Sequence, residues 1–168
     1  MPGINKTAVP DYALHVLEVL ERGGFEAWIV GGWVRDALLG NAAHDVDITS
    51  NAHWQESEQL LLNAGVTVHR TGIEHGTLTA VVAGHPIEIT TYRVEGTYSD
   101  SRHPDSVEFV SSVTEDLARR DLTINAMAYH PVRGLLDPYG GAEDLAQGII
   151  RAVGDPYKRF SEDALRVL

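Results

Sequence analysis

Two aspartates separated by a single residue, Asp45 and Asp47, form the pattern most suggestive of chemistry in this chain. They belong to a segment, residues 45–49, whose composition predicts a β-strand, and alternate residues of a strand point to the same face. Two carboxylates held close together repel each other unless a cation lies between them. Mg²⁺ commonly combines one or two carboxylates with substrate phosphates. The pair therefore predicts a Mg²⁺ site, although an isolated Asp-x-Asp pattern is more often solvated acid.

A pair of glycines and an arginine precede these aspartates. Gly31 and Gly32 end a short apolar segment, and Arg35 follows in what we expect to be a short helix. Glycines let a phosphate approach the backbone, the start of a helix favours negative charge, and Arg35 can add a charge-assisted hydrogen bond. A glycine pair alone usually marks only a turn. Combined with the aspartates, it favours metal-dependent phosphoryl or nucleotidyl transfer.

Turn residues divide the chain into alternating helical and strand-like segments. We expect α-helices at about 11–22, 33–40, 54–64 and 114–128, and another beginning after Gly154-Asp155-Pro156. We expect β-strands at 25–30, 45–49, 66–69 and 107–110, and a hairpin that turns at Gly84-His85-Pro86. The polar segment 95–105 is expected to be a long loop. This order of elements predicts a small mixed α/β domain followed by the beginning of a helical one.

The composition excludes several other classes of protein. The chain has 168 residues with 24 Asp and Glu against 13 Lys and Arg, a formal net charge of −11, which argues against purely electrostatic binding of nucleic acid. It contains no cysteine, so it has no disulfide, thiolate nucleophile or cysteine-based zinc site. Its histidines lack the spacing of zinc motifs. Because the N-terminal segment has neither a signal peptide nor a membrane span, we expect a soluble, cytoplasmic protein without a membrane partner.

Four segments resemble, in order, the motifs of one enzyme family. IVGGWVRDALLGNAAHDVDIT (29–49) resembles the nucleotidyltransferase signature of the DNA polymerase beta superfamily. RRDLTINAMAYHP (119–131) is similar to a ribose-recognition motif, and DPYGGAEDLAQGIIRAVGDP (137–156) to a hinge between a catalytic head and a neck. EDALR (162–166) is similar to a base-selecting motif. The chain thus resembles class II tRNA nucleotidyltransferases, the CCA-adding enzymes, and the related bacterial poly(A) polymerases.

The resemblance implies a fold and a division into domains. The fold would be α/β (α+β): a DNA polymerase beta-like nucleotidyltransferase head with a mixed sheet flanked by helices, and then the start of a helical neck. We place the head at residues 1–138 and a truncated neck at 139–168. The chain stops within an amphipathic run that has no helix-ending signal. We therefore expect it to be an N-terminal fragment.

The resemblance also implies roles for individual residues. Asp45 and Asp47 would hold the catalytic metal ions, and Glu88 could assist the metal or activate the RNA 3′-hydroxyl, unless it is simply an exposed strand acid. The residues implied to bind the nucleotide are Gly31, Gly32, Arg35, Arg119, Arg120, Asp121, Asn125, Asp163 and Arg166.

Within this set, the two glycines and Arg35 would seat the triphosphate, and the Arg119–Asn125 group would contact the sugar and nearby phosphates. Asp163 and Arg166 would pair with the edge of cytosine or adenine, and their i, i+3 spacing would make them neighbours on one helical face.

The implied activity is template-independent addition of CCA to tRNA 3′ ends from CTP and ATP, with Mg²⁺ as cofactor and release of pyrophosphate. Close alternatives keep this chemistry but change the product: a CC-adding enzyme, an A-adding enzyme or a poly(A) polymerase. The segment 95–105 matches the position of a flexible family loop thought to help switch from C to A addition, or it is an ordinary surface loop. A different class also stays open, in which this chain binds nucleotide and metal with little turnover of its own.

Overall fold

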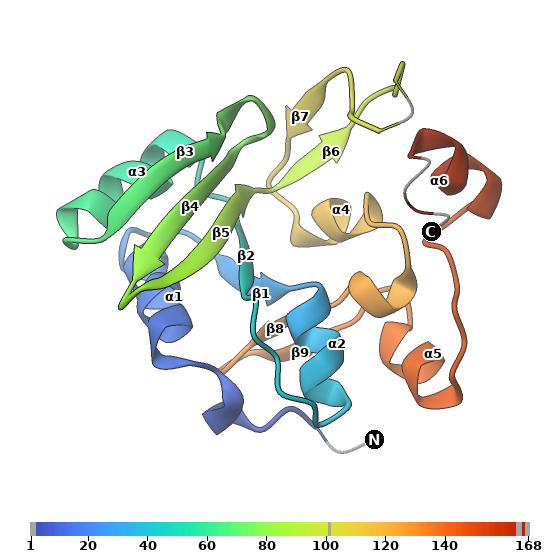
Figure 1. The fold of residues 1–168 in the computed structure, drawn as a ribbon, viewed down its shortest axis with the longest axis horizontal. Helices are drawn as coiled ribbons and strands as arrows, with labels where there is room; N and C mark the ends of the chain where they lie inside the picture. Colours follow the sequence, from blue (N-terminus) through green and yellow to red (C-terminus); the bar gives the residue numbers. More distant parts are fainter. Residues whose placement is uncertain (1–2, 101, 164–165, 167–168) are drawn as a thin grey trace.

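The structure, a computed structural model, describes residues 3–100, 102–163 and 166 (Figure 1). The helices are α1 (Asp11–Arg22), α2 (Gly32–Leu38), α3 (Trp54–Asn63), α4 (Val113–Ala118), α5 (Gly141–Gln147) and α6 (Pro156–Glu162), with 3-10 turns η1 (Lys6–Ala8), η2 (Ile73–His75) and η3 (Thr123–Asn125). The strands are β1 (Ala27–Val30), β2 (Asp47–Ser50), β3 (Thr67–Gly72), β4 (Thr77–Val82), β5 (His85–Thr91), β6 (Arg93–Glu95), β7 (Val107–Phe109), β8 (Ala128–His130) and β9 (Gly134–Leu136).

A mixed sheet organises the molecule. Within the described residues, seven strands form this sheet in the order β3-β4-β5-β2-β1-β8-β9, and β6 pairs with β7 in a separate ribbon. β2 and β5 run parallel, with Asp47 opposite Glu88, while the other neighbouring strands of the sheet run antiparallel. The predicted mixed sheet flanked by helices is confirmed.

Hydrophobic residues on the two faces of the sheet explain how the helices pack. Leu17 of α1 and Leu61 of α3 belong to the main core together with Ile48 and Ile89 of the central strands. On the other face, Leu117 of α4 joins a second cluster under β1. The half of this second face formed by β3, β4 and β5 is polar and open to solvent, and it is the half beside the candidate catalytic acids.

The predicted hairpin between β4 and β5 is present, but its turn lies earlier than expected, because His85 and Pro86 already pair with β4 as part of β5. Its two turn residues, Ala83 and Gly84, have φ values of 49° and 80°. Two consecutive positive φ values are typical of the tight turns whose twist matches that of a two-stranded ribbon. This turn fixes the register that brings Thr79 of β4 opposite Glu88 of β5.

The predicted helix at 114–128 is wrong in its second half. α4 ends at Ala118, and Ala128–His130 forms strand β8. The reason is a pairing with a later segment: Thr123 N donates to Arg151 O and Val153 N donates to Asp121 O, both at 2.9 Å. These bonds hold the backbone around Leu122 extended, so a continuous helix cannot form.

The prediction of a loop at 95–105 needs a smaller correction. Glu95 ends strand β6 and pairs with Val107 of β7, so the loop begins at Gly96. The side chain of Glu95 is only 9% exposed, because it points into a polar network rather than into solvent.

The C-terminal segment also departs from expectation. α6 ends at Glu162, and Asp163 has extended backbone angles (φ −140°, ψ 115°), so Asp163 and Arg166 do not share one helical face. Before it, Ala142 and Leu145 of α5 pack against the main core, and the domain boundary at 138 stays a prediction. None of the helices in the described part of the chain is both long and apolar enough to cross a membrane.

Candidate active site

Three acids converge where β2 begins. Asp45 precedes the strand, contrary to the predicted strand start, but Asp45, Asp47 and Glu88 still line one cavity of about 450 Å³ together with Val46, Thr79 and Pro86. Parallel pairing of β2 with β5 places Asp47 directly opposite Glu88. Adjacent strands are about 4.8 Å apart. The sheet therefore brings together two acids that are 41 residues apart in the sequence.

These carboxylates are crowded. Burial raises the pKa of Asp47, and the nearby Asp45 raises it further, while the Arg120 guanidinium opposes both effects. Burial also raises the pKa of Glu88, and the Asp47 carboxylate adds to that rise. Raised pKa values mean that the protein environment disfavours the ionised forms. A divalent cation between the acids would remove this penalty.

The second cavity lies on the other side of the same aspartates. It has a volume of about 340 Å³ and is lined by Gly32, Trp33, Arg35, Asp36, Ala42, Ala43, His44, Asp45 and Asp47. Arg35 is held at its edge by two hydrogen bonds of 2.9 Å, from Nε to Asp36 and from Nη1 to Asn125 Oδ1. The bond to Asn125 joins two of the predicted nucleotide-binding segments, which lie 90 residues apart.

Gly31 occupies a position that requires glycine. Its φ of 73° and ψ of −137° belong to a region that other residues rarely adopt. A Cβ atom there would lie 3.0 Å from Nη1 of Arg120. The glycine therefore serves close packing against Arg120 as well as the predicted approach of a phosphate.

Arg120 lies behind this glycine turn. Its Nε atom is buried and has no hydrogen-bond partner among the described residues. Burial lowers the pKa of Arg120 to about 10, and Arg119 lowers it too, while Asp116, Asp47 and Asp121 oppose the shift. The guanidinium thus interacts electrostatically with all three of these acids, and its predicted contact with the nucleotide stays a prediction.

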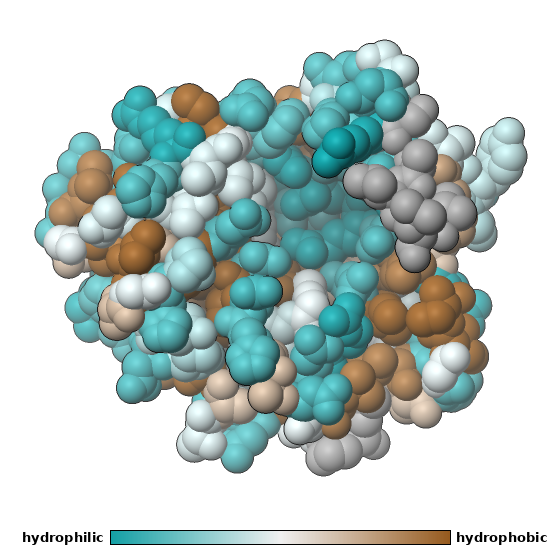
Figure 2. All heavy atoms as spheres, viewed as in Figure 1, coloured by the Kyte–Doolittle hydropathy of each residue, from teal (hydrophilic) through white to brown (hydrophobic). Residues whose placement is uncertain are grey.

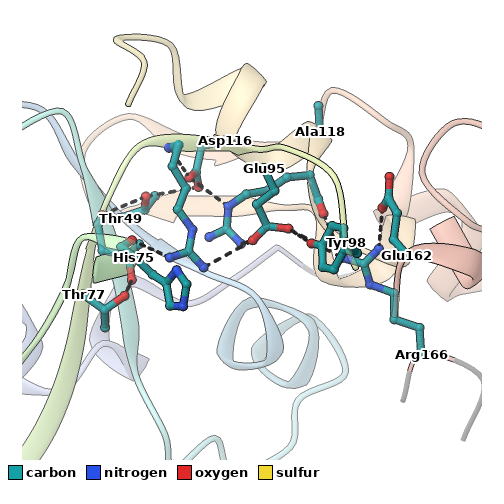
Figure 3. A network of polar contacts seen from close by, with 12 residues as sticks. Thr49, His75, Thr77, Glu95, Tyr98, Asp116, Ala118, Glu162 and Arg166 are labelled. Carbon is teal, nitrogen blue, oxygen red and sulfur yellow. Dashed lines mark hydrogen bonds and ion pairs between the residues drawn. The ribbon is translucent and has the colours of Figure 1, made fainter. Parts of the chain in front are cut away.

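Arg119 and Arg166 meet in a polar network on the same side of the sheet (Figure 3). Asp116, which is fully buried, accepts hydrogen bonds from Thr49 Oγ1, the backbone N of Arg93 and Nε of Arg119, at 2.9–3.2 Å. Glu95 forms ion pairs with Arg93, Arg119 and Arg166 at 3.3, 3.2 and 3.8 Å.

Arg166 is anchored at several points in this network. Its Nη1 donates to Glu162 at 2.8 Å and to the carbonyl of Arg159 at 3.1 Å, and its guanidinium lies 5.8 Å from the ring centroid of Tyr98. Tyr98 in turn donates to Glu95. A cavity of about 450 Å³ separates the 96–98 segment from α6, and the hydrophilic hollow in Figure 2 lies in this part of the molecule.

Asp121, another of the residues predicted to bind the sugar, makes a local contact. Its carboxylate accepts a hydrogen bond from the backbone N of Leu122 at 2.7 Å. The structure therefore groups the predicted residues into two sets: the acids, the glycines, Arg35 and Asn125 around the two cavities, and Arg119 and Arg166 in the network. The roles of the individual residues stay predictions.

Comparison with known protein families identifies the family of this chain. A family model described as the poly A polymerase head domain matches residues 27–151, which is most of the chain. The chain belongs to this family. The poly A polymerase head domain thus begins at β1 and includes both cavities and α5.

Curated relatives that share this head domain carry one name. The chain is 53% identical over 156 residues to a protein of Ligilactobacillus salivarius and 54% identical over 153 residues to one of Leuconostoc mesenteroides, both named CCA-adding enzyme. These alignments cover 93% and 91% of this chain but 38% and 37% of the relatives. The chain therefore spans less than two fifths of the length of these proteins.

Solved structures show the same head domain. The Bacillus stearothermophilus CCA-adding enzyme in complex with CTP matches with a TM-score of 0.82 and 40% identity, over 93% of this chain and 36% of that one. A tRNA nucleotidyltransferase complexed with a primer tRNA and an incoming ATP analog matches with a TM-score of 0.68 and 33% identity, over 90% of this chain and 42% of that one. The predicted family resemblance is confirmed.

Sequence reasoning missed two residues of this head domain that the structure makes prominent. Asp116 lies within the predicted helix 114–128, and its position three residues before Arg119 is a signal for an ion pair. Thr79 lines the acid cavity, and only the strand register, which the sequence does not state, could have revealed it.

Proposed function

We propose that the complete gene product carrying this chain adds CCA to the 3′ ends of tRNA, using CTP and ATP and releasing pyrophosphate. The observation that carries the proposal is the cavity in which Asp45, Asp47 and Glu88 converge, with Arg35 across the two aspartates from Glu88. We take the reaction and its tRNA substrate from the curated relatives, which are named CCA-adding enzyme. In each step the 3′-hydroxyl oxygen bonds to the α-phosphorus, and the bond from that phosphorus to pyrophosphate breaks.

The donor set fits a magnesium ion held by two carboxylates. Asp45 and Asp47, which line both cavities, would be the protein ligands. Mg²⁺ commonly takes one or two carboxylates and completes its shell with phosphates and water. The bound ion would activate the hydroxyl and neutralise charge on the triphosphate.

The remaining residues would position the nucleotide. Arg35, oriented by Asp36 and Asn125, would pair with the triphosphate. Glu88 is the candidate acceptor of the hydroxyl proton, because burial and Asp47 raise its pKa towards the range useful for proton transfer. Arg119, Arg120 and Asp121 would contact the sugar, and Asp163 with Arg166 the base edge. The lack of cysteine fits a reducing compartment, and we propose the cytoplasm.

Incorporation of labelled nucleotides separates the possible products. The complete gene product should add two C and one A to a tRNA that lacks its CCA end. Addition of A alone from ATP, without any use of CTP, would contradict CCA addition and favour an A-adding enzyme or a poly(A) polymerase. Addition that stops after two C residues would identify a CC-adding enzyme.

The 168-residue chain by itself provides a second test. Because it covers only 38% of its relatives, we propose that it binds nucleotide and metal but turns over slowly. Titration with CTP in the presence of Mg²⁺ should give saturable binding, and tRNA extension should be far slower than with the complete gene product. Equal rates for the two proteins would refute this proposal.

A further inference from the structure

The two cavities beside Asp45 and Asp47 differ in charge. One includes Arg35. The residues that line the other are Asp45, Val46, Asp47, Thr79, Pro86 and Glu88, so acids and a hydroxyl surround it without an arginine or lysine. A triphosphate carries several negative charges and would be poorly neutralised on the acidic side. The acidic cavity suits a neutral hydroxyl instead.

Phosphoryl transfer requires space on two opposite sides of the reacting phosphorus atom. The attacking and leaving oxygens lie roughly in line on opposite sides of the phosphorus atom. If pyrophosphate leaves on the Arg35 side of the aspartates, the attacking 3′-oxygen must arrive from the Glu88 side. This step rests on the proposed function, because it assumes nucleotidyl transfer at Asp45 and Asp47.

A polar surface continues outward from the acidic cavity across three strands. Asp47, Glu88, Thr79 and His69 occupy consecutive partner positions on β2, β5, β4 and β3. Thr71 Oγ1 and Thr79 Oγ1 are hydrogen-bonded at 2.9 Å. Two strand spacings, about 10 Å in all, separate Glu88 from His69. The row therefore leads from the catalytic acids to the edge of the sheet.

This row lies on the open face of the sheet. Val68, the neighbour of His69 in the chain, packs against the main core, so His69 points the opposite way. His69 and Thr71 are exposed, and Thr79 is half-buried. Hydroxyl and imidazole groups both donate and accept hydrogen bonds, which matches the phosphates, 2′-hydroxyls and base edges of single-stranded RNA.

We infer that the exposed face of β3 and β4, formed by His69, Thr71 and Thr79, binds the last nucleotides of the acceptor RNA and directs its 3′-hydroxyl towards Glu88. There the 3′-oxygen forms its bond to the α-phosphorus, pyrophosphate leaves with the electrons of the broken bond, and the hydroxyl proton passes to a carboxylate and then to water. The catalytic head itself thus contributes to RNA binding.

Steady-state kinetics of the complete gene product test this inference. His69→Ala and Thr79→Val should each raise KM for tRNA lacking CCA about 2- to 10-fold, the loss expected for one hydrogen bond, and leave KM for CTP unchanged. His15→Ala is the matched control, because His15 is exposed on α1, which packs against the other face of the sheet. A rise in KM for CTP with no change for tRNA would assign this cavity to the nucleotide and overturn the inference.

Photo-crosslinking gives a readout that does not depend on turnover. A photoreactive amino acid in place of His69 should crosslink to the 3′-terminal nucleotides of the tRNA, and the same residue in place of His15 should not. Absence of a crosslink at position 69 would refute the RNA surface. If the variant with the photoreactive residue at position 69 crosslinks to the tRNA but the wild-type protein incorporates neither CTP nor ATP, the proposed function fails while the RNA surface stands.

Discussion

Carboxylates cluster in two places on the same side of the sheet, and their surroundings differ: Asp116 is buried, whereas Asp47 is half-buried and Glu88 is exposed. Asp116 accepts three hydrogen bonds and pairs with Arg119, and its neighbour Glu95 contacts three arginines. Asp47 and Glu88 lie opposite each other on the paired strands β2 and β5, and no hydrogen-bond donor in the described part of the chain bonds to their carboxylates. The first site is electrostatically complete, whereas the second needs a cation from outside.

The difference separates a structural role from a chemical one. Acids whose hydrogen-bonding capacity is filled hold the fold together, since breaking a buried pair leaves an uncompensated charge. Acids that crowd one another weaken the fold, and their presence indicates that they serve another purpose. Substitutions of the crowded acids should therefore reduce mainly activity, and substitutions in the hydrogen-bonded network should reduce mainly stability.

The largest effect is expected in the acid cavity. Asp47→Asn should reduce CTP incorporation by the complete gene product about 1,000-fold or more, because metal-ion stabilisation is worth several kcal/mol and each 1.36 kcal/mol is a tenfold change in rate. The melting temperature should stay the same or rise, since the substitution removes repulsion. Substantial residual activity in the double variant Asp45→Ala/Asp47→Ala would rule out the metal assignment.

The reverse is expected at Asp116. Asp116→Asn should lower the free energy of unfolding by about 3 kcal/mol, measured by urea denaturation, because the Arg119 guanidinium loses its paired carboxylate and the backbone N of Arg93 loses a charged acceptor. Glu115→Gln is the control, since Glu115 is an exposed acid on the same helix. Equal stability of the two variants would show that the network contributes nothing to the fold.

A smaller effect on rate is expected at Glu88. Glu88→Gln should reduce kcat about 100-fold, within the range for loss of a general base, without lowering the melting temperature. Glu74→Gln, an exposed acid just before the same hairpin, should behave like the wild type. An unchanged kcat would identify Glu88 as an ordinary strand acid.

The smallest effect concerns a third polar cluster, at the end of β8. Burial lowers the pKa of His130, and Arg133 lowers it further, although Glu21 acts in the other direction. Nδ1 of His130 accepts hydrogen bonds from the backbone N atoms of Val132 and Arg133, at 3.1 and 3.3 Å. A lowered pKa means that the folded state prefers the neutral ring. Stability is therefore complete above the ordinary histidine pKa and is lost as the pH falls below it.

His130→Asn should reduce this dependence on pH, because the amide oxygen can replace Nδ1 as an acceptor and does not titrate. Urea denaturation at pH 5.5 and 7.5 should show a smaller loss of stability on acidification in the variant than in the wild type. Parallel pH dependences for the two proteins would contradict the assignment. A smaller loss in the variant would show that His130 stabilises the fold only in its neutral form.

Local sequence signals identified most of the helices, the central strands and the residues around the aspartates. The errors occurred where distant segments determine the local structure. Nothing near Arg120 signals that residues 121–123 pair with Arg151–Val153, so the sequence alone favoured a continuous helix there. Glu95 fits the pattern of a polar loop, because two of the three arginines that pair with it lie far away in the chain, just after α4 and beyond α6. Short-range patterns do not report such partners.

The parallel pairing of β2 with β5 has a consequence for how the protein folds. The chain between Asp47 and Glu88 contains α3, β3 and β4, so the pairing of these two residues closes a long loop. Pairings that close such long loops form late and slowly, whereas the β4–β5 hairpin can form early from local contacts. We therefore expect the acid cavity to form late in folding, so that the ability to bind metal there would arise together with the finished sheet.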